Sequence, residues 1–240
     1  MMAVTQASTG MIDSSAGAGS QKASGSAWLA VAAGAIGSFM ATLDISIVNA
    51  ALPTIQGEIG ASASEGTWVA TSYLVAEIVV IPLAAWFERM LGLRRFLLIA
   101  AVLFTIFSVL CGTADSLGVM IIGRIGQGFT GGAMIPTAMS IIAMRLPPAQ
   151  QPIGTAIFGG TVILGPILGP LVGGWLTETF SWHYAFFLNV PICAVLIVLL
   201  IVAAFAVPTL WVRMSPENRK LPLTWGNLHS RGIDPWNEAA

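Results

Sequence analysis

Long apolar runs alternate with short polar connections along most of this chain, and the alternation predicts its secondary structure. Each run approaches the roughly 20 residues that an α-helix needs to cross about 30 Å of hydrocarbon. Because the connections are short, consecutive runs are expected to form antiparallel helical hairpins. We therefore predict an all-α membrane protein, with a six-transmembrane-helix bundle over residues 28–207. The predicted spans are about 28–53, 67–87, 96–113, 118–144, 153–176 and 185–207.

Polar segments flank the six runs. Residues 1–27 are rich in Ser, Ala, Gly and Thr and lack the basic start, short apolar core and cleavage site of a secretory signal. We predict a disordered cytoplasmic tail here, so that the first span itself directs insertion. Residues 208–240 are predicted to form a second cytoplasmic tail.

The distribution of Lys and Arg between the connections predicts the orientation. If the spans alternate, every Lys and Arg outside them falls on one side, including Arg94, Arg95 and Arg145. The connections on the other side contain acidic residues and no Lys or Arg. Positive residues in short loops are retained in the cytoplasm. Both termini are therefore predicted to be cytoplasmic.

Composition excludes several classes of protein. Of the 240 residues, 56% are hydrophobic and 9% are charged, whereas soluble domains are about 25% charged. The net charge of −1 gives no indication of nucleic acid binding. Cys111 and Cys193 lie far apart in apolar runs, so neither a disulfide framework nor a metal site is predicted. The motifs H-E-x-x-H and G-x-S-x-G and a phosphate-binding loop are absent, so no catalytic residues are predicted.

Three ionisable residues, Asp44, Glu77 and Arg124, lie deep inside apolar runs. A charge in hydrocarbon costs about 2.5–3.5 kcal/mol even on lenient scales, so it is retained only with a partner or a function. At about 1.5 Å per residue, Asp44 lies about 24 Å from the inner end of the first span. Arg124 lies about 9 Å below the outer end of the fourth span on the same basis. The two residues share one depth in the outer third of the membrane, and we predict that they pair.

Two roles remain open for this pair. In one, protonation of Asp44 releases Arg124 and shifts the balance between two helix arrangements. In the other, a static salt bridge joins the first span to the fourth. Glu77, near the midplane, is interpreted as a second protonatable site, a contact for a cationic substrate, or a protonated and hydrogen-bonded helix residue.

The fifth run combines a glycine stripe with two prolines. Glycine at every fourth position lets another helix approach closely, and each proline removes an amide donor and favours a bend. The stripe is interpreted either as a seal that slides during transport or as ordinary tight packing. The residues concerned are Gly165, Pro166, Gly169, Pro170, Gly173 and Gly174.

The fourth run contains Gly126, Gly128 and Gly131, which match the dinucleotide fingerprint G-x-G-x-x-G. That motif needs a preceding strand and a ribose-binding acid after its helix. Here it lies inside a predicted span, and we attribute the glycines to close helix packing.

Four segments resemble motifs of one transporter family. They are residues 43–53 (LDISIVNAALP), 124–128 (RIGQG), 165–174 (GPILGPLVGG) and 182–191 (WHYAFFLNVP). On these motifs the chain resembles the amino-terminal half of a major facilitator superfamily carrier, in the fourteen-span drug:proton antiporter group of EmrB/QacA type. The resemblance implies half of a major facilitator fold, built as a 3+3 inverted repeat. A proline downstream of the buried charge in both the first and the fourth run points the same way.

The resemblance also implies a function, namely proton-coupled multidrug efflux across the bacterial inner (plasma) membrane. It assigns proton coupling to Asp44, Arg124 and Glu77, and places Asn49 and Gln127 in the substrate cavity. The substrate is expected to be a hydrophobic or cationic small molecule, and the proton gradient takes the place of any cofactor. The partners implied are the lipid bilayer, a periplasmic adaptor and an outer-membrane channel, and no nucleic acid.

The chain departs from the family pattern in two places. The loop between the second and third runs usually reads G-x-L-x-D-R-x-G-R-R, whereas here Arg89 occupies the aspartate position. Gly92, Arg94 and Arg95 keep the gating role that the family pattern implies for this loop. After about residue 226 the chain is polar where the family continues into further spans. We interpret the chain as truncated or frame-disrupted and missing its C-terminal half; the alternative is a non-transporting remnant or a half-carrier that needs a partner chain.

Overall fold

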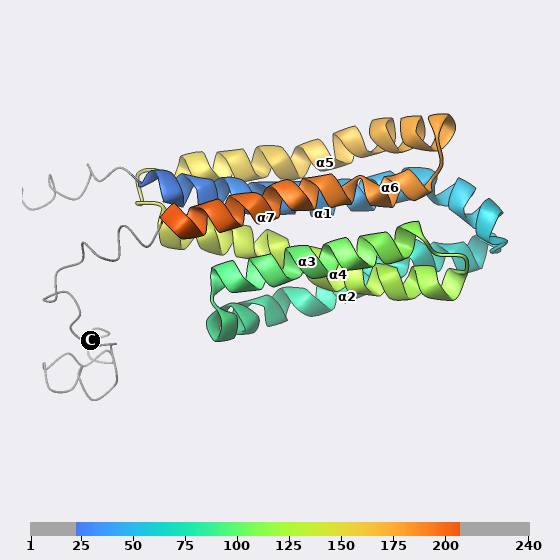
Figure 1. The fold of residues 1–240 in the computed structure, drawn as a ribbon, viewed down its shortest axis with the longest axis horizontal. Helices are drawn as coiled ribbons and strands as arrows, with labels where there is room; N and C mark the ends of the chain where they lie inside the picture. Colours follow the sequence, from blue (N-terminus) through green and yellow to red (C-terminus); the bar gives the residue numbers. More distant parts are fainter. Residues whose placement is uncertain (1–22, 207–240) are drawn as a thin grey trace, which may run out of the picture. The chain divides into compact units, whose positions relative to one another are not determined.

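The computed structural model describes residues 23–206, and this part of the chain is helical almost throughout (Figure 1). The helices are α1 (Gly25–Ile59), α2 (Ala63–Leu91), α3 (Leu93–Gly112), α4 (Leu117–Arg145), α5 (Gln151–Thr179), α6 (His183–Phe187) and α7 (Asn189–Ala206). No strand occurs between residues 23 and 206. The predicted all-α class is confirmed.

The first helix is longer than the predicted first span. It begins at Gly25, because the Ser24 hydroxyl accepts a hydrogen bond from the Ala27 N–H at 3.3 Å and caps the first turn. Residues 25–27 are therefore helical and not part of a disordered tail, which is a correction to the predicted boundary. The helix also continues past Pro53 to Ile59. The remaining tail predictions, over 1–22 and 207–240, lie outside the described residues.

A single residue, Gly92, separates α2 from α3. Its φ of 78° and ψ of 143° lie in a region that residues with a side chain avoid. Its N–H donates to the Glu88 carbonyl at 2.8 Å and closes the last turn of α2. The predicted loop between the second and third spans is thus a reversal at one residue.

Helices α6 and α7 meet at Leu188, whose φ of −58° and ψ of −29° are helical and whose N–H donates to the Tyr184 carbonyl at 3.0 Å. Pro191 weakens the helix at this junction, because it has no N–H to donate to the Phe187 carbonyl. Asn189 lies at the start of α7 with its side chain fully buried.

Helix α4 lies at the centre of the packing and contacts α1, α2, α3 and α5. Helix α5 packs chiefly on α1, and α2 chiefly on α4 (Figure 1). The largest apolar core joins α1, α3, α4 and α7 through buried side chains that include Met40, Phe104, Met134 and Leu196.

Glycines allow the helices to approach closely at these crossings. A Cβ atom at Gly128 would lie 2.9 Å from the Cα atom of Tyr73 on α2 and closer still to its carbonyl oxygen, which leaves no room for a side chain. On α5, Cβ atoms at Gly165, Gly169 and Gly173 would overlap α1, whereas Gly174 faces open space. The close approaches at Gly128, Gly165, Gly169 and Gly173 match the expected packing, Gly174 takes no part in it, and whether the stripe slides stays a prediction.

Both prolines of the fifth run lie inside one continuous helix, α5. Pro170 cannot donate to the carbonyl of Pro166, four residues earlier. The Ser46 hydroxyl of α1 donates to that carbonyl at 3.4 Å. The polar group that proline leaves without a helical donor is thus satisfied by a neighbouring helix.

Five helical stretches are long and apolar enough to cross a membrane: α1, α2, α3, α5 and His183–Ala203. Helix α4 has 29 residues but is not among them, because its glycines, Arg124 and Gln127 lower its mean hydropathy. Those polar side chains are buried by neighbouring helices. The count of six spans and the cytoplasmic termini stay predictions.

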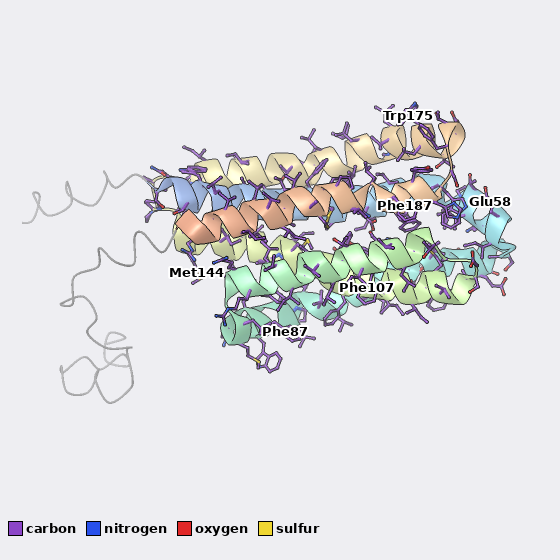
Figure 2. All side chains as sticks on the ribbon, in the orientation of Figure 1. Glu58, Phe87, Phe107, Met144, Trp175 and Phe187 are labelled. Carbon is purple, nitrogen blue, oxygen red and sulfur yellow. The ribbon has the colours of Figure 1, made fainter. Side chains whose placement is uncertain are left out.

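The outward faces of α2 and α5 are strongly apolar. On α2 the side chain of Ile78 is 69% exposed, and on α5 that of Leu171 is 70% exposed. Figure 2 shows such side chains projecting outward, with Trp175 toward one end of α5 and Phe87 toward one end of α2. Surfaces of this kind suit contact with lipid or with another apolar helix.

Candidate functional site

A buried ion pair joins α1 to α4. The Arg124 Nη1 atom lies 2.5 Å from the Asp44 Oδ2 atom, and the two side chains are 1% and 0% exposed. It is the one ion pair among the described residues. The pairing predicted from matched depth is therefore present.

The second carboxylate oxygen of Asp44 is also satisfied. Its Oδ1 accepts hydrogen bonds from the Asn189 side-chain amide at 2.6 Å and from the Gln127 amide at 3.2 Å. An ionised carboxylate only accepts hydrogen bonds, so three donors on two oxygens match that form. The site is therefore built so that both oxygens of the buried Asp44 carboxyl group accept hydrogen bonds.

The guanidinium of Arg124 has several further partners. Its Nε donates to the Val69 carbonyl of α2 at 3.1 Å, and its Nη1 donates to the Gln127 side-chain oxygen at 3.0 Å. Its Cζ lies 4.2 Å from the centre of the Tyr73 ring, which is a cation–π arrangement. Arg124 thus ties α2 into the same network.

Helix α3 completes the cluster. The Ser108 hydroxyl accepts from Gln127 at 2.7 Å and from Asn189 at 2.8 Å, and the Cys111 thiol donates to the Gln127 oxygen at 3.3 Å. The buried network, which we define as Asp44, Tyr73, Ser108, Arg124, Gln127 and Asn189, therefore connects α1, α2, α3, α4 and α7. One of its atoms, Asn189 Oδ1, is buried without a hydrogen-bond partner.

The other residues predicted to be functional lie outside this network. Glu77 is half-buried on α2, close to Gly132 of α4. Asn49 is exposed on α1, whereas Gln127, assigned to the substrate cavity with it, is fully buried beside Asp44. Gly92, Arg94 and Arg95 form the α2–α3 junction. The Gly165–Gly174 segment forms the contact between α5 and α1.

The sequence analysis missed Tyr73, Ser108 and Asn189. Asn189 belongs to the quoted segment 182–191, and a single amide next to a long apolar run was an available signal. Ser108 offered no such signal in the sequence, because isolated serines are common in apolar helices. The described residues contain no group of His, Cys, Asp or Glu that could hold a metal ion.

The architecture defines the class of this protein, a multi-pass helical membrane protein with a charged network in its interior. Among solved structures, it is similar to the proton:xylose symporter XylE bound to a bromodeoxyglucose, with a TM-score of 0.66 and 18% identity, over 73% of this chain and 44% of that one. The inward-open xylose transporter XylE of Escherichia coli matches with a TM-score of 0.64 and 18% identity, over 72% of this chain and 47% of that one. At 18% identity, these similarities show the fold alone.

Residues 34–236 match the Major Facilitator Superfamily, and the chain belongs to this family. It is 42% identical to the multidrug export protein EmrB of Haemophilus influenzae over 157 residues, which cover 65% of this chain and 31% of the relative. It is 42% identical to the colistin resistance protein EmrB of Acinetobacter baumannii over 164 residues, or 68% of this chain and 32% of the relative. The matched part thus spans about a third of the length of these relatives.

Proposed function

We propose that this chain is part of a proton-coupled multidrug antiporter of the bacterial inner (plasma) membrane. The observation that carries the proposal is the fully buried Asp44–Arg124 pair, held by amide donors from α4 and α7. In this proposal α4 crosses the membrane together with the five other stretches, the resulting six spans form a 3+3 inverted repeat, and both termini are cytoplasmic. The proton gradient is the energy source.

Proton coupling follows from the chemistry of the network. A proton on Asp44 removes the charge that attracts Arg124 and places a donor where three donors already converge. The buried, unpartnered Asn189 Oδ1 is an acceptor that the new O–H can use once the amide turns. Protonation therefore weakens the contacts among α1, α4 and α7, and one helix arrangement is replaced by another.

The other predicted residues have roles around this switch. The glycine stripe of α5 is the surface that slides over α1, while Gly92, Arg94 and Arg95 contribute to gating. Asn49 faces the substrate cavity, and Glu77 is a second protonatable site or a contact for a cationic substrate. Gln127 acts at the cavity through its bond to Asp44.

The substrates we propose are hydrophobic or cationic small molecules. The relatives are named for multidrug export, colistin resistance and, in FarB of Neisseria gonorrhoeae, fatty acid resistance. A periplasmic adaptor and an outer-membrane channel are the proposed protein partners.

The second candidate function is a half-carrier that needs a partner chain, or a remnant that does not transport. One observation favours it: the apolar outward faces of α2 and α5 suit contact with a second bundle.

Everted membrane vesicles test both candidates. The chain is produced alone, and together with the remaining C-terminal part of the Acinetobacter relative, while a pH-sensitive dye reports substrate-induced loss of internal acid. We expect a signal only from the co-produced pair, its loss in Asp44→Asn, and its retention in Asp115→Asn, which alters an exposed acid in the α3–α4 connection. Full coupling in Asp44→Asn would refute the proton role of that residue, and a signal from the chain alone would refute the half-carrier.

The proposed orientation has its own test. Cys111 and Cys193 are buried, so a cysteine introduced at Ser62 or Gln150 can be labelled above a low background. A maleimide that cannot cross the membrane should label Ser62→Cys from the outside and not Gln150→Cys. The reverse pattern would place the termini outside the cell.

A further inference from the structure

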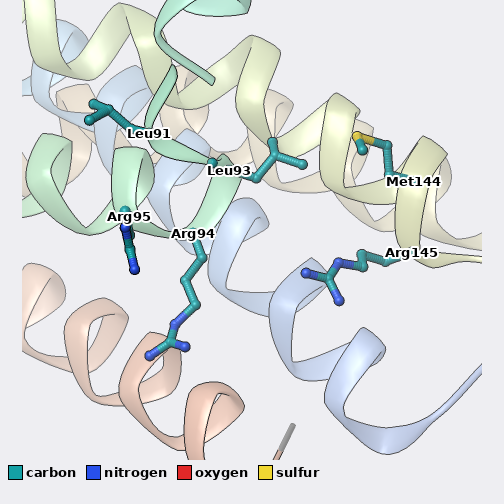
Figure 3. A pocket seen from close by; sticks show the side chains of 7 residues that line it. Leu91, Leu93, Arg94, Arg95, Met144 and Arg145 are labelled. Atoms are coloured by element: carbon teal, nitrogen blue, oxygen red, sulfur yellow. The ribbon is translucent and has the colours of Figure 1, made fainter. Parts of the chain in front are cut away.

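A pocket of about 540 Å³ lies where the α2–α3 junction meets the end of α4, and nothing in the network around Asp44 uses it. Arg94 and Arg95 come from the first turn of α3, and Arg145 comes from the last turn of α4. Figure 3 shows the side chains of Arg94 and Arg145 extending from these two helices toward the same opening. The pocket is lined by Leu91, Gly92, Leu93, Arg94, Arg95, Met144 and Arg145.

Within the described residues no carboxylate forms an ion pair with these arginines, and Glu88 near the end of α2 does not line the pocket. The first turn of α3 contains no acidic residue, and Gly92 provides no side-chain cap. Arg94 and Arg95 thus stand at the positive end of a helix dipole, where cations are disfavoured. An anion between the three guanidinium groups would relieve this repulsion.

The lining also has an apolar part. Met144 is 71% exposed and Leu91 is 37% exposed, and both border the arginines. A ligand that combines an anionic group with hydrocarbon therefore fits the pocket better than a fully polar anion. Arginine suits a phosphate in particular, because its planar guanidinium can donate two parallel hydrogen bonds to phosphate oxygens.

We propose that this pocket binds the phosphate group of an anionic phospholipid from the cytoplasmic leaflet, with Arg94, Arg95 and Arg145 as the ligating residues. Leu91 and Met144 contact the first part of its acyl chains. The assignment to the cytoplasmic leaflet rests on the proposed orientation, whereas the proposal of a phosphate site rests only on the residues that line the pocket. An anionic headgroup attracts a nearby arginine strongly enough to change affinity about fivefold.

The test is lipid retention by the 240-residue chain, measured by native mass spectrometry after reconstitution in phosphatidylglycerol or phosphatidylcholine nanodiscs. Both leaflets of a nanodisc carry the same lipid and no substrate is present, so orientation and transport do not enter the result. We expect preferential retention of phosphatidylglycerol and about fivefold weaker retention in each of Arg94→Gln, Arg95→Gln and Arg145→Gln. Arg89→Gln is the matched control, because Arg89 is exposed near the end of α2 but does not line the pocket. Arg145→Lys keeps the positive charge but cannot donate two parallel hydrogen bonds to a phosphate. Its retention of phosphatidylglycerol should therefore lie between that of wild type and that of Arg145→Gln.

Three results would overturn the proposal. Equal weakening in Arg89→Gln would mean a diffuse field of positive charge instead of a site. Displacement of phosphatidylglycerol by millimolar inorganic phosphate would mean a site for a soluble anion. Equal retention of both lipids by the wild-type chain, or an unchanged preference for phosphatidylglycerol in the three Arg→Gln variants, would mean that the arginines do not select a headgroup.

Discussion

The clearest energetic consequence of the structure concerns the pair at the centre of the network, and a double-mutant cycle measures it. Asp44→Asn keeps the shape of the side chain but replaces one acceptor oxygen by an NH₂ donor. That donor must face either Arg124 or the two amides of Gln127 and Asn189, all of which already donate to Asp44. Either orientation sets donor against donor and leaves the arginine without a counter-charge.

The size of the effect follows from the contacts. Breaking a buried pair by removing one partner costs about 3–5 kcal/mol, and Asp44→Asn should fall in this range. Arg124→Met leaves the carboxylate with two of its three donors, so about 3 kcal/mol, the lower end of that range, is expected. In the double variant no charge remains unpaired, so its cost should be less than the sum by about 2–3 kcal/mol.

The free energy of unfolding is measured by titrating the detergent-solubilised chain with sodium dodecyl sulfate, with circular dichroism and tryptophan fluorescence as readouts. The buried Trp182 reports on packing. Asp115→Asn, at an exposed acid, is the control and should change stability by less than about 0.5 kcal/mol. If the destabilisations of the two single variants sum to that of the double variant within about 0.5 kcal/mol, the coupling on which the proposed switch depends is refuted.

Further predictions use the same unfolding measurement. Gly169→Ala overlaps α1 and should destabilise by about 1–3 kcal/mol, whereas Gly174→Ala, in open space, should stabilise by up to about 1 kcal/mol; similar effects would contradict the packing role of the stripe. Asn189→Leu removes a donor from Asp44 and should cost about 1.5–3 kcal/mol, and a neutral result would show that this bond is dispensable. Gly92→Ala forces a side chain onto a φ of 78° and should cost about 1–2 kcal/mol, and no loss of stability would show that the junction relaxes.

Much of the fold could be predicted from the sequence, because lipid exposure requires long apolar helices and the runs are unmistakable. The pairing of Asp44 with Arg124 could be predicted as well, since helical rise converts sequence position into depth. The junction between α6 and α7 at Leu188 was not predicted although Pro191 signals it, because the apolar run continues on both sides with Asn189 as its one polar residue.

The rest of the site depends on the rotation of each helix about its own axis, which hydropathy does not specify. Whether Asn189 and Ser108 face Asp44 is decided by how α3 and α7 pack against α1, and only coordinates give that packing. Helix α4 shows the opposite case, since its low hydropathy reflects polar groups buried by its neighbours. A criterion of apolar composition therefore passes over the helix that holds the centre of the structure.

The wide sequence separation within the network has a consequence for biosynthesis. Arg124 follows Asp44 by 80 residues, and Asn189 follows it by 145. At a translation rate of roughly 5–20 residues per second, Asp44 is made about 4 to 16 s before Arg124, and Asn189 follows still later. During that interval the carboxylate has none of the partners that it has in the finished protein. The nascent first helix must therefore keep Asp44 neutral or stay with the insertion machinery until α4 and α7 are made, so translation speed itself becomes a variable in how much protein assembles.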